Sequence, residues 1–187
     1  MAATQLDSKT ALIVIDLQKI VASIPTAHPF ADVLENASHL AATFRQHGLP
    51  VVLVNVVGTA PGRKGQPHVG GAFPPEWSEL VPELNQQPQD HLVSKKTWGA
   101  FTGTDLEAYL KSADITQVVV CGVATSVGVE STARHAHELG FNVTLAVDAM
   151  TDTSAEAHAN SLERIFPQLG EAATSKEIAN LLSTRSA

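Results

Sequence analysis

The residues of this chain that can do acid–base or nucleophilic chemistry stand directly after or at the end of short apolar runs. They comprise two carboxylic acids, two lysines, one thiol and a glycine turn. They are Asp16, Lys95, Lys96, Cys121, Gly122 and Asp148. Where an acid and a lysine share one crevice, the pair can bind a small substrate and move a proton to it.

The runs that precede these residues are continuous and rich in β-branched residues, which is typical of strands buried on both faces. They cover residues 11–15, 51–56, 91–94, 117–121 and 142–147, with a short sixth at 172–174. Helical periodicity or capping signals mark residues 30–47, 105–113, 127–139, 154–166 and 175–182. Because strands alternate with helices, we predict an α/β fold: a Rossmann-like, three-layer α/β/α sandwich with a mainly parallel sheet of five to six strands.

In an open parallel sheet, ligands bind beyond the carboxyl ends of the strands. We therefore expect Asp16, Lys95 and the turn after Gly122 to face one crevice. Each also has a structural explanation, since an aspartate can cap a loop, a lysine pair can be solvated and a lone cysteine can fill the core. Residues 57–88 are rich in proline and glycine, and we expect this insert to shape a pocket wall, with a short helix at 75–84.

Length and composition narrow the class of protein. The chain has 187 residues, 44% of them hydrophobic, and a formal net charge of −7. We expect a single domain over residues 1–187, and an acidic surface disfavours nucleic acid as a partner. The apolar runs are too short to span a membrane, and the polar start has no signal-peptide pattern, so we expect a cytoplasmic protein. One cysteine excludes an internal disulfide.

Three motifs in order carry a resemblance to a known family. The first is Asp16-Leu17-Gln18, and the second joins Lys95 to Ala100-Phe101 and Thr104-Asp105-Leu106. The third comprises Gly122, Thr125, Gly128, Val129, Thr132, Ala133 and Ala136, followed by Asp148-Ala149. In this order and spacing the chain resembles the isochorismatase-like hydrolases, or cysteine hydrolase superfamily, over residues 9–152.

The chain departs from the amidases of that family at the nucleophile. The resemblance places their thiol at position 128, where this chain has Gly128. Cys121 lies seven residues earlier, inside a predicted strand, so we interpret it as a core residue. A thiolate gains its stabilisation at a helix N-terminus and not within a sheet. A serine mechanism needs an adjacent base, and His135 and His137 are expected to point away from the site.

A glycine at this position also occurs in the true isochorismatases, which are understood to cleave a vinyl ether without a covalent enzyme intermediate. The resemblance then implies Asp16 as the general acid that protonates the enol-ether carbon, with Lys95 orienting it or binding a substrate carboxylate. Lys96 is the alternative to Lys95, because register at a strand end can slip by one residue. Gly128 would complete the catalytic set.

The resemblance also implies a set of substrate-binding residues. Backbone N–H groups from Thr125 to Gly128 would present a positive helix end to an anion, after a cis peptide at Val123-Ala124. Arg63, with Lys64 and His68, would bind carboxylates or lie on a solvated loop. Trp98 would form the floor of the pocket or pack against the protein interior. Phe73, Trp77 and Phe101 are expected to pack against the interior. The full set is Gln18, Arg63, Trp98, Val123, Ala124, Thr125, Ser126 and Val127.

No metal-ligand or nucleotide-binding pattern is found, so we expect no metal and no cofactor. We predict a hydrolase of a small acidic or enol-ether metabolite that acts by non-covalent acid catalysis. The alternatives are a catalytically degenerate family member that binds a small molecule, and an amidase that uses Cys121 or a serine. The resemblance further implies a homo-oligomer, a dimer or a tetramer.

Overall fold

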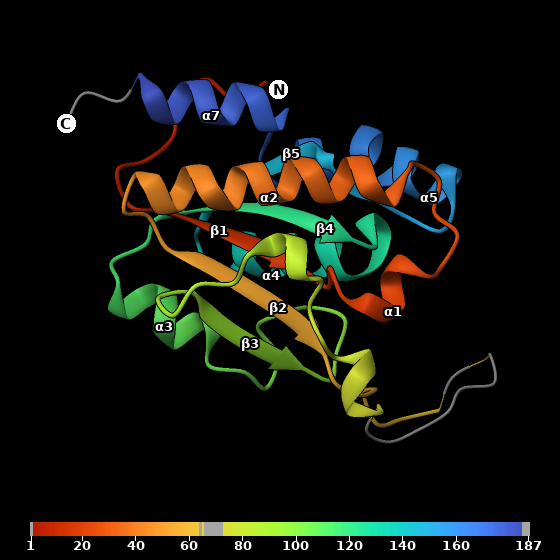
Figure 1. Cartoon of the computed structure of the whole chain (residues 1–187). Helices are drawn as coiled ribbons and strands as arrows, with labels where there is room; N and C mark the ends of the chain where they lie inside the picture. Colours follow the sequence, from red (N-terminus) through yellow and green to blue (C-terminus); the bar gives the residue numbers. More distant parts are fainter. Residues whose placement is uncertain (1, 64, 66–72, 185–187) are drawn as a thin grey trace.

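The computed structural model describes residues 2–63, 65 and 73–184, which form a six-stranded parallel sheet in the order β3-β2-β1-β4-β5-β6 (Figure 1). Every neighbouring pair of these strands is parallel. The strands are β1 (Thr10–Ile15), β2 (Val51–Val56), β3 (His91–Lys95), β4 (Gln117–Val123), β5 (Asn142–Thr151) and β6 (Glu171–Ala173). Their carboxyl ends therefore meet at one edge of the sheet.

Helices cover both faces of the sheet, which confirms the predicted three-layer α/β/α sandwich. Helices α2 and α7 lie on one face, and α3 and α4 lie on the other (Figure 1). The α-helices are α1 (Lys19–Ala22), α2 (Phe30–Gln46), α3 (Leu106–Ser112), α4 (Glu130–Glu138), α5 (Ala155–Asn160), α6 (Phe166–Leu169) and α7 (Ser175–Ser183). Two π-helical turns, η3 (Thr125–Val129) and η4 (Ser161–Ile165), precede α4 and α6.

The alternation of side chains along the central strand explains why the sheet has a core on each face. Leu12 and Val14 of β1 pack in the cluster that α2 and α7 cover. Ala11, Ile13 and Ile15 pack in the cluster that α3 and α4 cover. All six residues of β1 are buried, as expected for a strand with apolar layers on both sides.

Several elements differ from the sequence prediction. Strand β5 runs on to Thr151, so Asp148 lies within the strand and not after it. The helical segment predicted to stop before Pro167 continues to Leu169, because the π-turn η4 places the proline in the first turn of α6, where no N–H is needed. The short helix α1 was not predicted.

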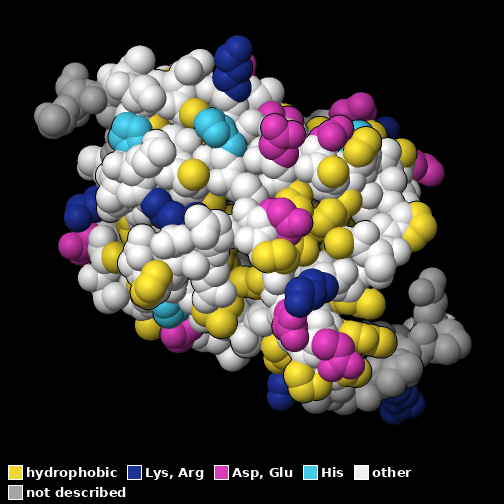
Figure 2. Space-filling view, viewed as in Figure 1, with side chains coloured by type: hydrophobic (Ala, Val, Ile, Leu, Met, Phe, Trp, Pro, Cys, Tyr) yellow, Lys and Arg dark blue, Asp and Glu magenta, His cyan; other side chains and the backbone are white. Residues whose placement is uncertain are grey.

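The 57–88 insert forms two short 3₁₀ helices and not the single helix expected at 75–84. They are η1 (Pro75–Trp77) and η2 (Pro82–Leu84), and both begin at a proline. Between them Leu80 forms an isolated bridge with Gln18. Hydrophobic side chains gather over this region and α1 (Figure 2), where Ile24 and Trp77 are exposed. Within the described ranges, no helix is long and apolar enough to cross a membrane.

Gly122 is the point where β4 approaches β1 too closely for a side chain. Its φ is +115°, and a Cβ atom built there would lie 2.0 Å from the carbonyl oxygen of Ile15. Because that neighbour is backbone in the centre of the sheet, it cannot yield without moving β1, the strand that leads into Asp16.

We predict that Gly122→Ala destabilises the protein by about 3 kcal/mol or more, since backbone strain and a backbone clash add. Gly103→Ala is the matched control, because Gly103 also has a positive φ, +71°, but has nothing within 4 Å of its Cβ position. That control should lose only about 1–2 kcal/mol. Chemical denaturation measures both losses, and equal losses would contradict the close approach at Gly122.

Candidate active site

An ion pair between Asp16 and Lys95 stands at the carboxyl edge of the sheet. Asp16 follows β1 with a φ of +50°, and Lys95 is the last residue of β3, two strands away. The Lys95 Nζ donates to Asp16 Oδ2 at 2.7 Å and to the backbone oxygen of Thr97 at 3.1 Å. The residues are 7% and 3% exposed, so the pair is buried. The structure thus brings Lys95, and not Lys96, to Asp16.

Burial and the lysine act on Asp16 in opposite directions. Burial raises the pKa of Asp16 to about 6, and it outweighs the charge and the hydrogen bond of Lys95, which lower the pKa. The second carboxyl oxygen, Oδ1, is buried and makes no hydrogen bond within the described part of the chain. Asp16 can therefore hold a proton on Oδ1 near pH 6 while Oδ2 stays bound to Lys95.

Gly128 lies against this carboxyl group in the π-turn η3. A Cβ atom built at Gly128 would lie 3.4 Å from Asp16 Oδ2 and 2.9 Å from Ile15 Cγ2. A side chain at this position would therefore require Ile15 to move. The turn follows a cis peptide between Val123 and Ala124, at the position implied by the resemblance.

These residues open onto a cavity of about 550 Å³. Segments that follow β1, β2, β3, β4 and β5 all contribute to its wall, as expected for a site at the carboxyl edge of a parallel sheet. The apolar wall consists of Val56, Ala60, Phe73, Trp98, Ala124 and Val127. The other lining residues are Asp16, Gly58, Thr59, Lys95, Lys96, Thr97, Gly128 and Thr153. A mostly apolar cavity with a few ionisable groups is typical of a small-molecule site.

Gln18 does not line the cavity, contrary to the predicted substrate-binding set. Its side chain is fully buried and holds the insert to the sheet. The amide nitrogen donates to the carbonyl oxygens of Val56 and Trp77, and the amide oxygen accepts from the Val56 N–H at 2.8 Å. Gln18 is therefore a structural residue whose donors and acceptor are already used.

The side chains of Thr125 and Ser126 also make hydrogen bonds outside the cavity. The buried Thr125 hydroxyl lies 2.8 Å from His158 Nδ1. Ser126 donates through both its N–H and its Oγ to Asp152 Oδ2, at 2.7 and 2.8 Å. The N–H of Val127 is bonded to the carbonyl oxygen of Ala124. The expected anion site at this helix start is therefore occupied by the protein's own carboxylate.

The cations of the insert do not reach the cavity within the described residues. Arg63 is exposed and is not among the described residues that line it. Lys64 and His68 lie outside the described residues. Trp98 does line the cavity, and its side chain is 64% exposed. Val123 precedes the cis peptide but is not part of the wall.

Asp148 has a structural role and not the strand-end role expected from the sequence. Its carboxylate accepts from the N–H and the hydroxyl of Ser175, at 2.6 and 2.8 Å, and so secures the start of α7. The acid that follows β5 is Asp152. The strand continues for four residues past the apolar run, which the sequence pattern did not indicate.

The sequence analysis missed several residues of the wall. Phe73, expected to pack, lines the cavity, and so do Thr59, Ala60 and Thr153. Three of these belong to the insert, and the only signal for them was the expectation that the insert shapes a pocket wall. No spacing rule could select individual residues in such an irregular segment.

Cys121 is placed as predicted, in the core and away from the cavity. It lies within β4, is 0% exposed and belongs to the cluster beneath α2. Burial, and the charge of Asp148 to a smaller extent, raise the pKa of its thiol to about 12. Such a thiol carries almost no thiolate near neutral pH.

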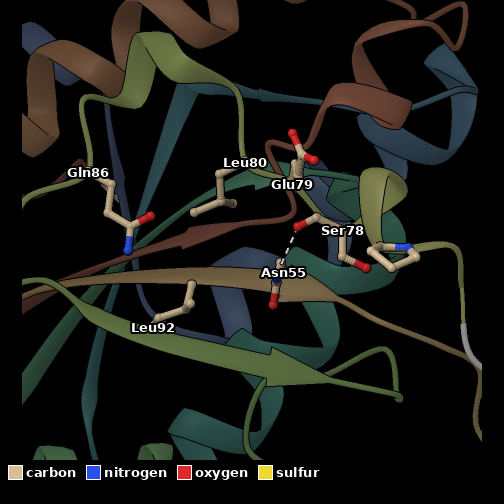
Figure 3. Close-up of a pocket in the computed structure, with 7 residues that line it drawn as sticks. Asn55, Ser78, Glu79, Leu80, Gln86 and Leu92 are labelled. Atoms are coloured by element: carbon tan, nitrogen blue, oxygen red, sulfur yellow. Dashed lines mark hydrogen bonds between the residues drawn. The ribbon is translucent and has the colours of Figure 1, made fainter.

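The described residues offer little support for an alternative site. No group of three or more His, Cys, Asp or Glu side chains there is arranged to hold a metal ion. A second hollow of about 440 Å³ lies over β2 and β3, where Asn55 donates to the Ser78 oxygen (Figure 3). Glu79 is the ionisable residue of its wall, and its carboxylate pairs with Lys19. The cavity at the carboxyl edge therefore differs from this hollow in holding a buried acid–lysine pair.

Comparison with known proteins agrees with this fold and site. Residues 10–177 match the isochorismatase domain family. The isochorismatase family protein YwoC of Bacillus subtilis is 40% identical over 176 residues, covering 90% of this chain and 92% of that protein. The structure of an isochorismatase family protein from Burkholderia thailandensis superimposes with a TM-score of 0.92 at 38% identity, covering 96% of this chain and 98% of the other. The chain belongs to the isochorismatase family.

A relative that is named for its activity matches this chain over a smaller share of both proteins. Streptothricin hydrolase of Streptomyces noursei is 38% identical over 140 residues, which cover 74% of this chain and 48% of that enzyme. The similarity places a named hydrolase in the same family. It does not define what this chain acts on.

We predict that Lys95→Met raises the pKa of Asp16 further above 6, because the charge and the hydrogen bond that lower it are removed. An acid whose pKa is raised by folding stabilises the protein below about pH 4 and loses that contribution as pH rises through the folded pKa. The window of declining stability should therefore extend to higher pH in the variant. Carboxyl ¹³C NMR titration measures the shift.

Lys95→Gln serves as a second variant in case the methionine does not fold. Lys111→Met is the control, since Lys111 is exposed and pairs with Glu107 on α3. An unchanged or lowered pKa of Asp16 in both Lys95 variants would contradict the electrostatic coupling.

We predict that native Cys121 reacts with iodoacetamide at least about a thousand-fold more slowly than in denaturant. A pKa of about 12, three units above the ordinary value of 9.0, reduces the thiolate fraction by that factor before access is considered. Mass spectrometry over time gives both rates in the same protein. Rapid labelling of the native protein would contradict this prediction and would support the thiol as a nucleophile.

Proposed function

We propose that this protein hydrolyses a small acidic or enol-ether metabolite by non-covalent acid catalysis, with Asp16 as the general acid. The observation that carries the proposal is the buried carboxyl group beside the cavity, with Oδ2 bound to Lys95 and Oδ1 unpartnered among the described residues. Its pKa of about 6 suits a group that must hold a proton and then release it.

The proposed reaction uses an enol ether as the model substrate. The protonated Asp16 carboxyl group transfers its proton to the terminal carbon of the double bond, and the π electrons form the new C–H bond. The resulting oxocarbenium ion is attacked by water, and the hemiketal then loses its alcohol to give a ketone. The proton lost from the attacking water returns the carboxylate to its acid form, so the enzyme is regenerated.

Lys95 has two tasks in this scheme. It holds Oδ2 at 2.7 Å, which fixes the orientation of the carboxyl group. Once the proton has moved, the ammonium group stabilises the new carboxylate in a site that is largely closed to water. Gly128 contributes by lacking a side chain, because the turn can then pack closely against Asp16 and Ile15.

The covalent alternatives have weaker support. Cys121 is enclosed in β4, and no thiol lines the described part of the cavity. The Ser126 hydroxyl donates to Asp152, and no histidine is among the described lining residues to activate Thr59, Thr97 or Thr153. A family member that only binds a small molecule is the remaining alternative, and turnover separates it from the proposed enzyme.

We predict that the wild-type protein releases pyruvate from an enolpyruvyl ether and that Asp16→Asn loses at least about a hundred-fold in kcat, the usual contribution of a general acid. Isochorismate and the enolpyruvyl ether of cyclohexanol are the two substrates. In D₂O the pyruvate should carry one deuterium in its methyl group, because the transferred proton comes from solvent through Asp16. Coupled pyruvate assay and mass spectrometry provide the readouts.

Asp114→Asn is the matched control, since Asp114 is exposed and, like Asp16, has a positive φ, +54°. It should retain full activity. No pyruvate from either ether with the wild type would favour the binding-protein alternative. Full activity of Asp16→Asn would exclude Asp16 as the acid.

A further inference from the structure

The cavity offers one accessible cation among the described residues. Three ionisable residues line it there: Asp16, Lys95 and Lys96. Lys95 is buried and is held by Asp16 and by the Thr97 carbonyl oxygen. Lys96 makes no ion pair or hydrogen bond with any residue that the structure describes, and its side chain is exposed. The wall therefore offers one uncommitted ammonium group.

Other means of binding an anion are committed elsewhere within the described part of the wall. The helix start at Ser126 is bonded to Asp152, and Arg63 lies outside the cavity. Lys95 donates to Asp16 and to the Thr97 carbonyl. An anionic substrate therefore has Lys96 as its available charged partner.

The apolar wall of the cavity indicates that the rest of the ligand is apolar. Phe73 and Trp98 contribute two aromatic rings, and Ala124 and Val127 provide a surface close to Gly128. Trp98 is 64% exposed, although burying its ring would be favourable. A second carboxylate in this environment would have no described cation to meet it, and an unpaired charge against apolar groups is costly.

We infer that the substrate is a monocarboxylate whose carboxylate binds the Lys96 ammonium and whose apolar, unsaturated part lies against Phe73 and Trp98, within reach of Asp16. This inference rests on the proposed function and specifies the class of substrate. In this inference Lys96, the residue after Lys95, selects substrates by their charge. It also implies that a dianion such as isochorismate is a poorer substrate than a monoanionic enol ether.

A binding experiment tests Lys96 without requiring turnover. Benzoate and benzamide have the same shape and differ in charge, so calorimetry with both isolates the carboxylate contact. We expect the wild type to bind benzoate at least ten-fold more tightly than benzamide, and Lys96→Gln to lose this preference. Isophthalate, a dianion, should bind no more tightly than benzoate. Lys111→Gln, on the exposed surface of α3, should leave all three affinities unchanged.

Equal binding of benzoate and benzamide by the wild type, or no benzoate binding at millimolar concentration, would overturn the inference. So would a benzoate preference that survives in Lys96→Gln. Failure of the proposed function is a different result: Lys96-dependent benzoate binding with no pyruvate release from any enol ether. With an active enzyme, kcat/KM should be higher for the enolpyruvyl ether of cyclohexanol than for isochorismate.

Discussion

The buried contact between the Lys95 ammonium and the Asp16 carboxylate depends on the strand order of the sheet. The two side chains come from β3 and β1 and meet across the end of β2, which is possible only where three parallel strands end at one edge. Removing one partner of a buried pair typically costs about 3–5 kcal/mol, so the fold and the acid site support each other. The same burial raises the pKa of Asp16 to about 6 and makes the acid chemically useful.

Two glycines allow close packing around this pair in different ways. Gly122 lets β4 approach Ile15 so closely that a Cβ atom would touch backbone, which holds the end of β1 in place. Gly128 brings the following turn against Asp16 and leaves no side chain there. The packing around the acid therefore depends on absent side chains as much as on the groups present.

The distribution of charge around the site is shaped by acids that are not part of it. Asp152 occupies the helix start at Ser126, and Asp148 secures the start of α7 at Ser175. Because the first of these carboxylates satisfies the positive end of the turn, an anion in the cavity would have to be bound by a side chain. In our proposal that side chain is Lys96, one residue after the lysine that holds the acid.

Apolar periodicity and strand-end residues are local signals, and they were enough to predict the sheet, its covering helices and the position of Asp16 and Lys95 at strand ends. They also indicated that Cys121 belongs to the core. The choice between Lys95 and Lys96, the contacts of Gln18 with the insert and the position of Phe73 in the wall became clear from the folded chain. These outcomes depend on packing between segments that are far apart in the chain, and no local pattern encodes which partner a polar side chain meets.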